Sequence, residues 1–238
     1  MDQITKLKEK IRSGGKNVFF GGAGVSVPSG IPDFRSQDGL YNMEYKYPPE
    51  TIISHSFFQR MPSEFFRFYR NKMVYPSAKP NKAHLALARL ESEGLLETVI
   101  TQNIDGLHYA AGSKNVIELH GSIHRNHCVK CGRSYDLDYI CSFNDIPYCE
   151  CGGIVKPDVV LYEESLDSED ISNAVKYISD CDLLIIGGTS LSVYPAAGFI
   201  NYLKPGASIA IVNMSSTPAD RSADILINQS IDTVFELL

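Results

Sequence analysis

The sequence has no run of basic residues, no internal repeat and no low-complexity stretch. Asp and Glu number 28 against 22 Lys and Arg, so the formal net charge is −6. A mildly acidic chain without a basic patch is a poor candidate for a nucleic-acid-binding protein. No apolar run approaches the roughly 20 residues that span a bilayer. We therefore expect neither a nucleic-acid nor a membrane partner. These totals leave the oligomeric state open.

The charged N-terminal segment, residues 1–17, has no apolar core of the kind that a signal peptide needs. This predicts a cytoplasmic protein. In that compartment the six cysteines stay reduced, and clustered cysteines are metal ligands more often than disulfides. A length of 238 residues is enough for one large domain with a small inserted module.

Short apolar runs alternate with helical patterns along most of the chain. The apolar runs are residues 17–20, 98–100, 183–186, 208–212 and 224–227. The helical patterns are residues 3–13, 82–93, 168–179 and 195–203. Apolar strands that alternate with helices predict an α/β fold, in which a Rossmann-like parallel sheet is covered on both faces.

Two stretches break this alternation. Residues 35–80 are rich in aromatic residues and proline and predict a helical segment with loops, whereas residues 123–156 hold most of the cysteines. We expect these two stretches to form a smaller domain, made of the helical segment and a zinc-binding module. The Rossmann-like domain then comprises the remaining ranges, 1–34, 81–122 and 157–238.

The first strand runs directly into the glycine-rich loop Gly21-Gly22-Ala23-Gly24. Bare backbone amides at such a loop can approach a pyrophosphate. A loop of this kind on its own is more often a tight structural turn. Val27 stands where the dinucleotide fingerprint needs its third glycine. The acidic residue that usually binds the ribose of the dinucleotide is also missing. A common nicotinamide dehydrogenase is therefore disfavoured.

The cysteines form two close pairs, Cys128-x-x-Cys131 and, 17 residues later, Cys149-x-Cys151. One pair from each of two turns can surround a tetrahedral zinc ion. Four thiolates close the coordination shell, so this zinc would be structural rather than catalytic. Cys141 lies between the pairs and could replace one ligand. The other reading is a redox pair, but no thioredoxin-like context surrounds it.

A series of further motifs follows in a fixed order. They lie at residues 24–36 (Gly-Val-Ser-Val-Pro-Ser-Gly-Ile-Pro-Asp-Phe-Arg-Ser), 101–108 (Thr-Gln-Asn-Ile-Asp-Gly-Leu-His), 118–122 (Glu-Leu-His-Gly-Ser), 188–191 (Gly-Thr-Ser-Leu) and 211–213 (Ile-Val-Asn). With the paired cysteines, this set resembles the sirtuin family, in its bacterial type, from about residue 15 to the C-terminus. The resemblance implies an NAD-dependent protein-lysine deacetylase with one structural zinc. Its partners would be acetyl-lysine proteins or peptides, and its products nicotinamide and O-acetyl-ADP-ribose.

The resemblance also implies roles for individual residues. His120 would be the catalytic base, and Asn103 and Asp105 would act with it at the nicotinamide pocket. The NAD contacts would be Gly22, Ala23, Gly24, Asp33, Phe34, Arg35, Gln102, Asn103, Ile104, Asp105, His120, Gly188, Thr189, Ser190, Asn213 and Ile231. The zinc ligands would be Cys128, Cys131, Cys149 and Cys151.

The expected chemistry fits these residue types. Cleavage of the bond between nicotinamide and ribose builds positive charge on the sugar, so rate comes from orientation and from exclusion of water. A ribose hydroxyl must then lose a proton, and a histidine that titrates near neutral pH suits that step. Outside this motif set, a lone histidine such as His120 is more often structural, and the Asn103-x-Asp105 pair would usually be a turn.

Two other functions remain open at this stage. One is a protein ADP-ribosyltransferase on the same fold, which would not need His120 as a base. The other is a noncatalytic sensor of NAD or ADP-ribose. The presence of His120 together with Asn103 and Asp105 favours deacylation over both.

The chain departs from the family pattern near the expected peptide groove. Residues 159–163 occupy the place of a strand that often ends Phe-Gly-Glu and pairs with the substrate backbone, together with the loop at residues 192–194. Tyr162 is expected to stand in place of that glycine. Tyr69-x-x-Lys72 has the spacing of a Tyr-x-x-Arg pair that grips succinyl groups, but lysine has no planar fork, so we expect acetyl to be preferred.

Overall fold

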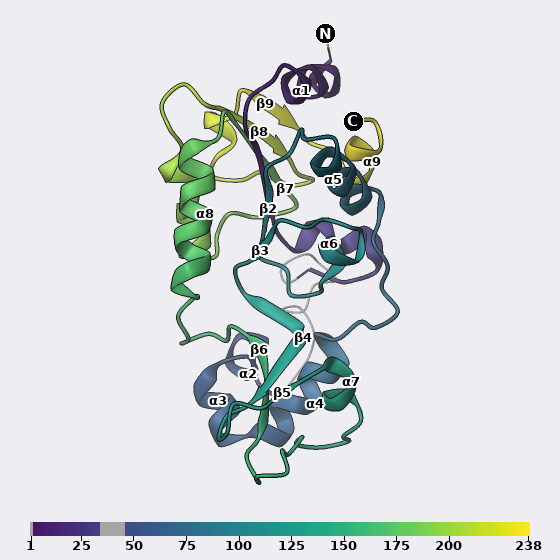
Figure 1. The fold of residues 1–238 in the computed structure, drawn as a ribbon, viewed down its shortest axis with the longest axis vertical. Coiled ribbons are helices and arrows are strands. Elements are labelled where there is room, and N and C mark those ends of the chain that lie inside the picture. Colours follow the sequence, from purple (N-terminus) through teal and green to yellow (C-terminus); the bar gives the residue numbers. More distant parts are fainter. Residues whose placement is uncertain (1, 34–45) are drawn as a thin grey trace.

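A computed structural model describes residues 2–33 and 46–238 of the chain. Its larger part is a six-stranded sheet of parallel strands in the order β3-β2-β1-β7-β8-β9 (Figure 1). The strands are β1 (Asn17–Gly21), β2 (Thr98–Thr101), β3 (Val116–Glu118), β7 (Leu183–Gly187), β8 (Ser208–Val212) and β9 (Ile225–Ile227). The α/β fold class expected from the sequence is confirmed. β3, at the edge of the sheet, was not predicted.

The two faces of the sheet are buried under different helices. Along β1, Phe19 packs into one apolar cluster with Leu87 and Phe235, whereas Val18 and Phe20 pack into another. The first cluster lies under α1 (Gln3–Arg12), α5 (Lys82–Ser92) and α9 (Ile231–Glu236). The second lies under α8 (Ser168–Asp180) and the 3-10 helix η4 (Ala196–Tyr202), on the opposite face (Figure 1). Burial on both faces explains why the central strands are continuous apolar runs.

The element at residues 195–203 differs from its prediction in kind. The sequence pattern indicated an α-helix, and the structure has the 3-10 helix η4. Gly198 in the middle of this short element lowers its α-helix propensity, which favours the tighter 3-10 form. The remaining short elements of the large part are α6 (Leu107–Ala110), η1 (Ala23–Val25), η2 (Val27–Ser29) and η5 (Asp220–Ser222).

The smaller part combines helices with a three-stranded antiparallel sheet in the order β5-β4-β6 (Figure 1). Its elements are α2 (Pro49–Ile52), α3 (His55–Arg60), α4 (Pro62–Lys72), β4 (Gly121–Cys128), β5 (Ser134–Tyr135), α7 (Leu137–Cys141) and β6 (Val155–Val159). Phe65, Phe66 and Tyr69 of α4 share one apolar cluster with Ile140 of α7 and Val155 of β6. The helical segment and the cysteine-bearing sheet are therefore packed around a common core.

None of the helices in the described ranges, 2–33 and 46–238, combines the length and apolar character needed to cross a membrane.

The chain passes between the two parts at residues 119–121 and returns at 158–160, and these two crossings lie side by side. Gly121 pairs with Val159, and the Val160 N–H donates to the His120 carbonyl at 3.0 Å. Gly121 has φ 74°, and a Cβ added there would lie 1.9 Å from the Asp158 carbonyl oxygen. Only glycine fits this crossing, because a side chain would be both strained and in collision with backbone.

We expect Gly121→Ala to lower the free energy of unfolding by at least about 3 kcal/mol, because overpacking adds to left-handed strain. Gly206→Ala is the matched control, since Gly206 also has positive φ but nothing within 4 Å of the added Cβ. The free energy of unfolding of Gly206→Ala should fall by only about 1 kcal/mol. Urea unfolding of both variants measures the difference. Equal losses would mean that the Asp158 carbonyl moves aside without cost.

Candidate active site and metal centre

The two glycine loops that follow β1 and β7 are in contact. Strand order reverses between these strands, and a crevice at such a switch point is the usual ligand site of an open α/β sheet. The Gly24 N–H donates to the Gly188 carbonyl at 2.8 Å, and the Gly22 N–H donates to the Gly187 carbonyl at 3.3 Å. A Cβ on Gly24 would lie 2.8 Å from the Gly188 Cα, so the close approach requires glycine.

A cavity of about 480 Å³ opens above these loops. The expected NAD contacts that line it are Gly22, Ala23, Gly24, Asp33, Gln102, Asn103, His120, Gly188, Thr189, Ser190, Asn213 and Ile231. Ile104 and Asp105 instead line the adjoining cavity. Phe34 and Arg35 lie outside the described residues. The structure therefore gathers every described member of the expected set around two neighbouring cavities.

Hydrogen bonds between side chains and backbone tie the strand ends of the larger cavity together. The Gln102 amide donates to the Thr189 hydroxyl at 3.0 Å, and the Asn213 amide donates to the Thr189 carbonyl at 2.7 Å. Gln102 follows β2, Thr189 follows β7 and Asn213 follows β8. These bonds fix the polar groups along the cavity before any ligand enters.

Asp105 is held by a small network that includes a residue not assigned a role from the sequence. The Ser26 hydroxyl donates to the Asp105 carboxylate at 2.6 Å, and the Asn103 amide donates to the Ser26 oxygen at 3.0 Å. The Leu107 N–H donates to the other Asp105 oxygen at 2.9 Å. Ser26 belongs to the glycine-loop motif, but its contact with Asp105 joins residues 79 positions apart, which the linear sequence does not reveal.

His120 lies between the two cavities and lines both. Its Nδ1 lies 2.9 Å from the Gln102 carbonyl, which can only accept, so Nδ1 carries the proton. In the neutral ring Nε2 is then left as a base. Burial lowers the pKa of His120 below 6.5, against the opposing effect of the Gln102 carbonyl. The ring is therefore neutral at pH 7 and able to accept a proton.

The second cavity, of about 280 Å³, reaches from His120 towards the helical segment. Its apolar lining includes Ile31, Ile53, Met73, Tyr75, Ile104, Leu161 and Val193. Lys72 also lines it, which differs from the expected solvated position on a helix. This cavity is mostly apolar, and its polar lining includes Asn103, Asp105 and His120 as well as Lys72, Glu163 and Glu164. A mostly apolar channel with a few polar groups suits an alkyl side chain.

The segment after β6 differs from the expectation at one position. The backbone conformation that favours glycine is found at Glu163, with φ 75°, and not at Tyr162. Tyr162 is 40% exposed and lines the apolar cavity. The departure from the glycine of the family pattern therefore falls on Glu163.

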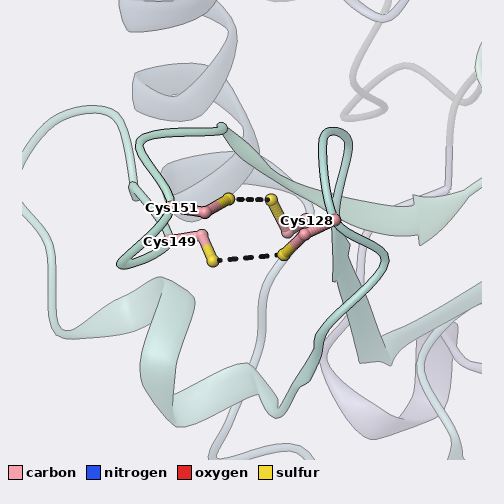
Figure 2. Close-up of side chains that lie close together, drawn as sticks. Cys128, Cys149 and Cys151 are labelled. Carbon is pink, nitrogen blue, oxygen red and sulfur yellow. Dashed lines mark hydrogen bonds between the residues drawn. The ribbon is translucent and has the colours of Figure 1, made fainter.

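The four expected zinc ligands converge at the edge of the small sheet (Figure 2). The sulfur atoms of Cys128 and Cys151 are 3.5 Å apart, and those of Cys131 and Cys149 are 3.6 Å apart. All four lie within 4.8 Å of one another and none forms a disulfide. A tetrahedral zinc with bonds of about 2.3 Å places its sulfurs about 3.8 Å apart, so this cluster fits one zinc ion. Cys141 is not part of the cluster.

The model of the Sir2 family matches residues 22–195, which is more than half of the chain. A curated relative from Clostridium perfringens, called an NAD-dependent protein deacetylase, is 58% identical over 98% of this chain and 97% of its own length. A relative of the same name from Cutibacterium acnes is 51% identical over 95% of this chain and 93% of its own.

Solved structures agree with the sequence relatives. A Sir2 structure with a deacetylated p53 peptide and 3'-O-acetyl-ADP-ribose has a TM-score of 0.91 and 38% identity, covering 98% of this chain and 96% of that one. A Sir2 structure with a p53 peptide and NAD+ has a TM-score of 0.86 and 37% identity, covering 99% and 96%. The matched residues include both glycine loops, His120 and the four clustered cysteines, and the chain belongs to the Sir2 family.

Proposed function

We propose that the protein removes acetyl groups from protein lysines with NAD as cosubstrate, releasing nicotinamide and O-acetyl-ADP-ribose. The observation that carries this proposal is the position of His120, a neutral histidine with Nε2 unprotonated that lines both the crevice and the channel. NAD would occupy the crevice, with its nicotinamide end reaching into the channel beside Asp105, and an acyl-lysine would occupy the rest of the channel. The relatives named NAD-dependent protein deacetylases support the same activity.

In this proposal the residues around His120 have separate roles in the reaction. Asn103 and Asp105, fixed through Ser26, hold the nicotinamide end of NAD in one orientation. His120 accepts the proton from a ribose hydroxyl after the glycosidic bond has broken. The apolar channel wall excludes water from the reacting carbon, which suppresses hydrolysis of NAD.

Nicotinamide release separates this function from its two alternatives. The protein is incubated with NAD, with and without an acetyl-lysine peptide, and free nicotinamide is measured. A deacetylase releases nicotinamide in proportion to peptide deacetylation. An ADP-ribosyltransferase releases it with labelling of an unacetylated acceptor, and a sensor binds NAD without releasing it.

We also propose a cytoplasmic location and a division of the chain into a Rossmann-like domain (1–34, 81–122 and 157–238) and a small domain (35–80 and 123–156). The four cysteines clustered as metal ligands support this location, because clustered cysteines of a reducing compartment are metal ligands more often than disulfides. The separate apolar clusters of the two parts support the division. Acetyl-lysine proteins or peptides are the proposed partners.

His120→Ala should reduce deacetylation on the order of 100-fold, as expected for loss of a general base, and leave the zinc content unchanged. In the wild type, kcat/KM should hold its high-pH value until the pH falls through the pKa of His120, below 6.5, because the neutral ring is the active form. A pH profile of both proteins tests this. Turnover close to wild type in the variant would remove His120 from the mechanism.

The purified protein should carry about one zinc per chain, held by the four clustered cysteines. The zinc would not take part in the reaction. It would hold two turns of the small sheet together, so chelation should loosen that sheet and lower activity indirectly. Metal analysis of Cys149→Ala and Cys141→Ala assigns the ligands. Zinc lost from the first and retained by the second is the expected result, and the reverse would contradict it.

Acetyl-lysine should be processed with a higher kcat/KM than succinyl-lysine in otherwise identical peptides. Tyr69 is fully buried in the core of the small part and does not line the channel, so no Tyr-x-x-cation pair faces the acyl group. Lys72 lines the channel as a single point charge without a planar fork. Lys72→Met is the control and should leave acetyl turnover nearly unchanged. A higher value for succinyl-lysine would contradict the proposal.

A further inference from the structure

Residues 159–164, named here the groove segment, form one wall of the apolar channel. Backbone hydrogen bonds attach this segment on two sides. The Val160 N–H donates to the His120 carbonyl at 3.0 Å. On the side of the helical segment, the Tyr162 N–H donates to the Ile53 carbonyl at 3.0 Å, and the His55 N–H donates to the Tyr162 carbonyl at 2.9 Å.

Lys156 is buried beneath the groove segment, with 9% of its surface exposed. Its ammonium group donates to the Val159 carbonyl at 2.9 Å and to the Pro157 carbonyl at 3.2 Å. It also lies 3.1 Å from the Glu164 carboxylate. A lysine is seldom buried to this extent unless its charge is paired. Here its ammonium group joins the first residue of the segment, Val159, to the last, Glu164.

Glu164 closes the segment into a compact turn. One carboxylate oxygen accepts from the Leu161 N–H at 2.9 Å as well as from Lys156, and the other lies 2.7 Å from the His55 Nδ1. Burial by itself would raise the pKa of Glu164, but these hydrogen bonds and the Lys156 charge outweigh it and hold the pKa below its usual value. The carboxylate is therefore ionised at neutral pH and available to all three donors.

The side chain of Glu163 points towards the helical segment, as the side chain of Glu164 does. Its two carboxylate oxygens accept from the Ser56 N–H at 2.8 Å and from the Ser56 hydroxyl at 3.0 Å, at the start of α3. Successive side chains of an extended strand point to opposite faces. The left-handed conformation at Glu163 breaks this alternation, so that both carboxylates engage the helical segment. The strain at Glu163 is thus compensated by a specific attachment.

We propose that Lys156, Glu163 and Glu164 are positioning residues that fix the groove segment as a rigid template for the backbone of the acyl-lysine peptide. This inference rests on the proposed deacetylase function. A template held in its bound conformation lowers the ordering cost of peptide binding, and it leaves the NAD crevice, which these residues do not line, untouched.

The test compares Lys156→Met with Lys156→Arg. Lys156→Met removes the donors and leaves Glu164 without its cation, so the peptide KM should rise about tenfold, with the KM for NAD and kcat within about twofold of wild type. Lys156→Arg keeps charge and donors and should recover most of the loss. Lys82→Met is the matched control, because it breaks an exposed pair of 2.6 Å with Glu236, far along the chain from the segment. It should change none of these values.

Hydrogen exchange provides a readout that needs no activity. The backbone amides of residues 159–164 should exchange much faster in Lys156→Met and moderately faster in Glu164→Gln. Glu164→Gln is included because it changes the side chain less and is therefore less disruptive to the fold. Unchanged exchange in both variants, or equal changes in the KM values for peptide and NAD, would overturn the template. A wild type that releases no nicotinamide would refute the proposed function instead, while the exchange result would still decide whether the segment is anchored.

Discussion

The contact between the two glycine loops is the constraint on which the crevice depends. Gly24 and Gly188 approach so closely that a Cβ on either would collide with the other loop. The contact continues the pairing of β1 with β7 beyond Gly21 and Gly187, at the point where strand order reverses. Thr189, which follows directly, is thereby placed to join Gln102 on one side and Asn213 on the other. Residues from these four parts of the chain, together with His120 and Ile231, then line a single cavity.

The second part of the site is organised by a crossing of the chain rather than by the sheet. His120 follows β3 and precedes β4, so it lies where the large sheet ends and the small one begins. Its ring is oriented by the Gln102 carbonyl, and its own carbonyl holds Val160. The crevice and the channel share Ala23, Gln102, Asn103, His120 and Val193, and among these His120 is the residue that can accept a proton.

Much of this arrangement could be predicted from the sequence, for identifiable reasons. The central strands are buried on both faces and therefore read as unbroken apolar runs. Metal ligands need short spacings, so the cysteine pairs stand out, and the structure selects Cys149 over Cys141. β3 was not predicted because its three residues, Val116–Glu118, hold only two consecutive apolar residues before a glutamate. The contacts of Ser26 with Asp105 and of Lys156 with Glu164 depend on turns whose geometry no local pattern encodes. The left-handed conformation at Glu163 was not predicted, for the same reason.

One feature of the crossing has a mechanical consequence. The His120 carbonyl accepts from Val160, and Gly121 pairs with Val159, so the base and the peptide-facing wall are joined through adjacent backbone groups. The ring of the same residue is held separately, by the Gln102 carbonyl at the end of β2. Since the channel wall and the large sheet both hold His120, a displacement of one relative to the other strains a hydrogen bond at this residue. The alignment of the base with the channel wall is therefore coupled to the relative position of the two parts of the molecule.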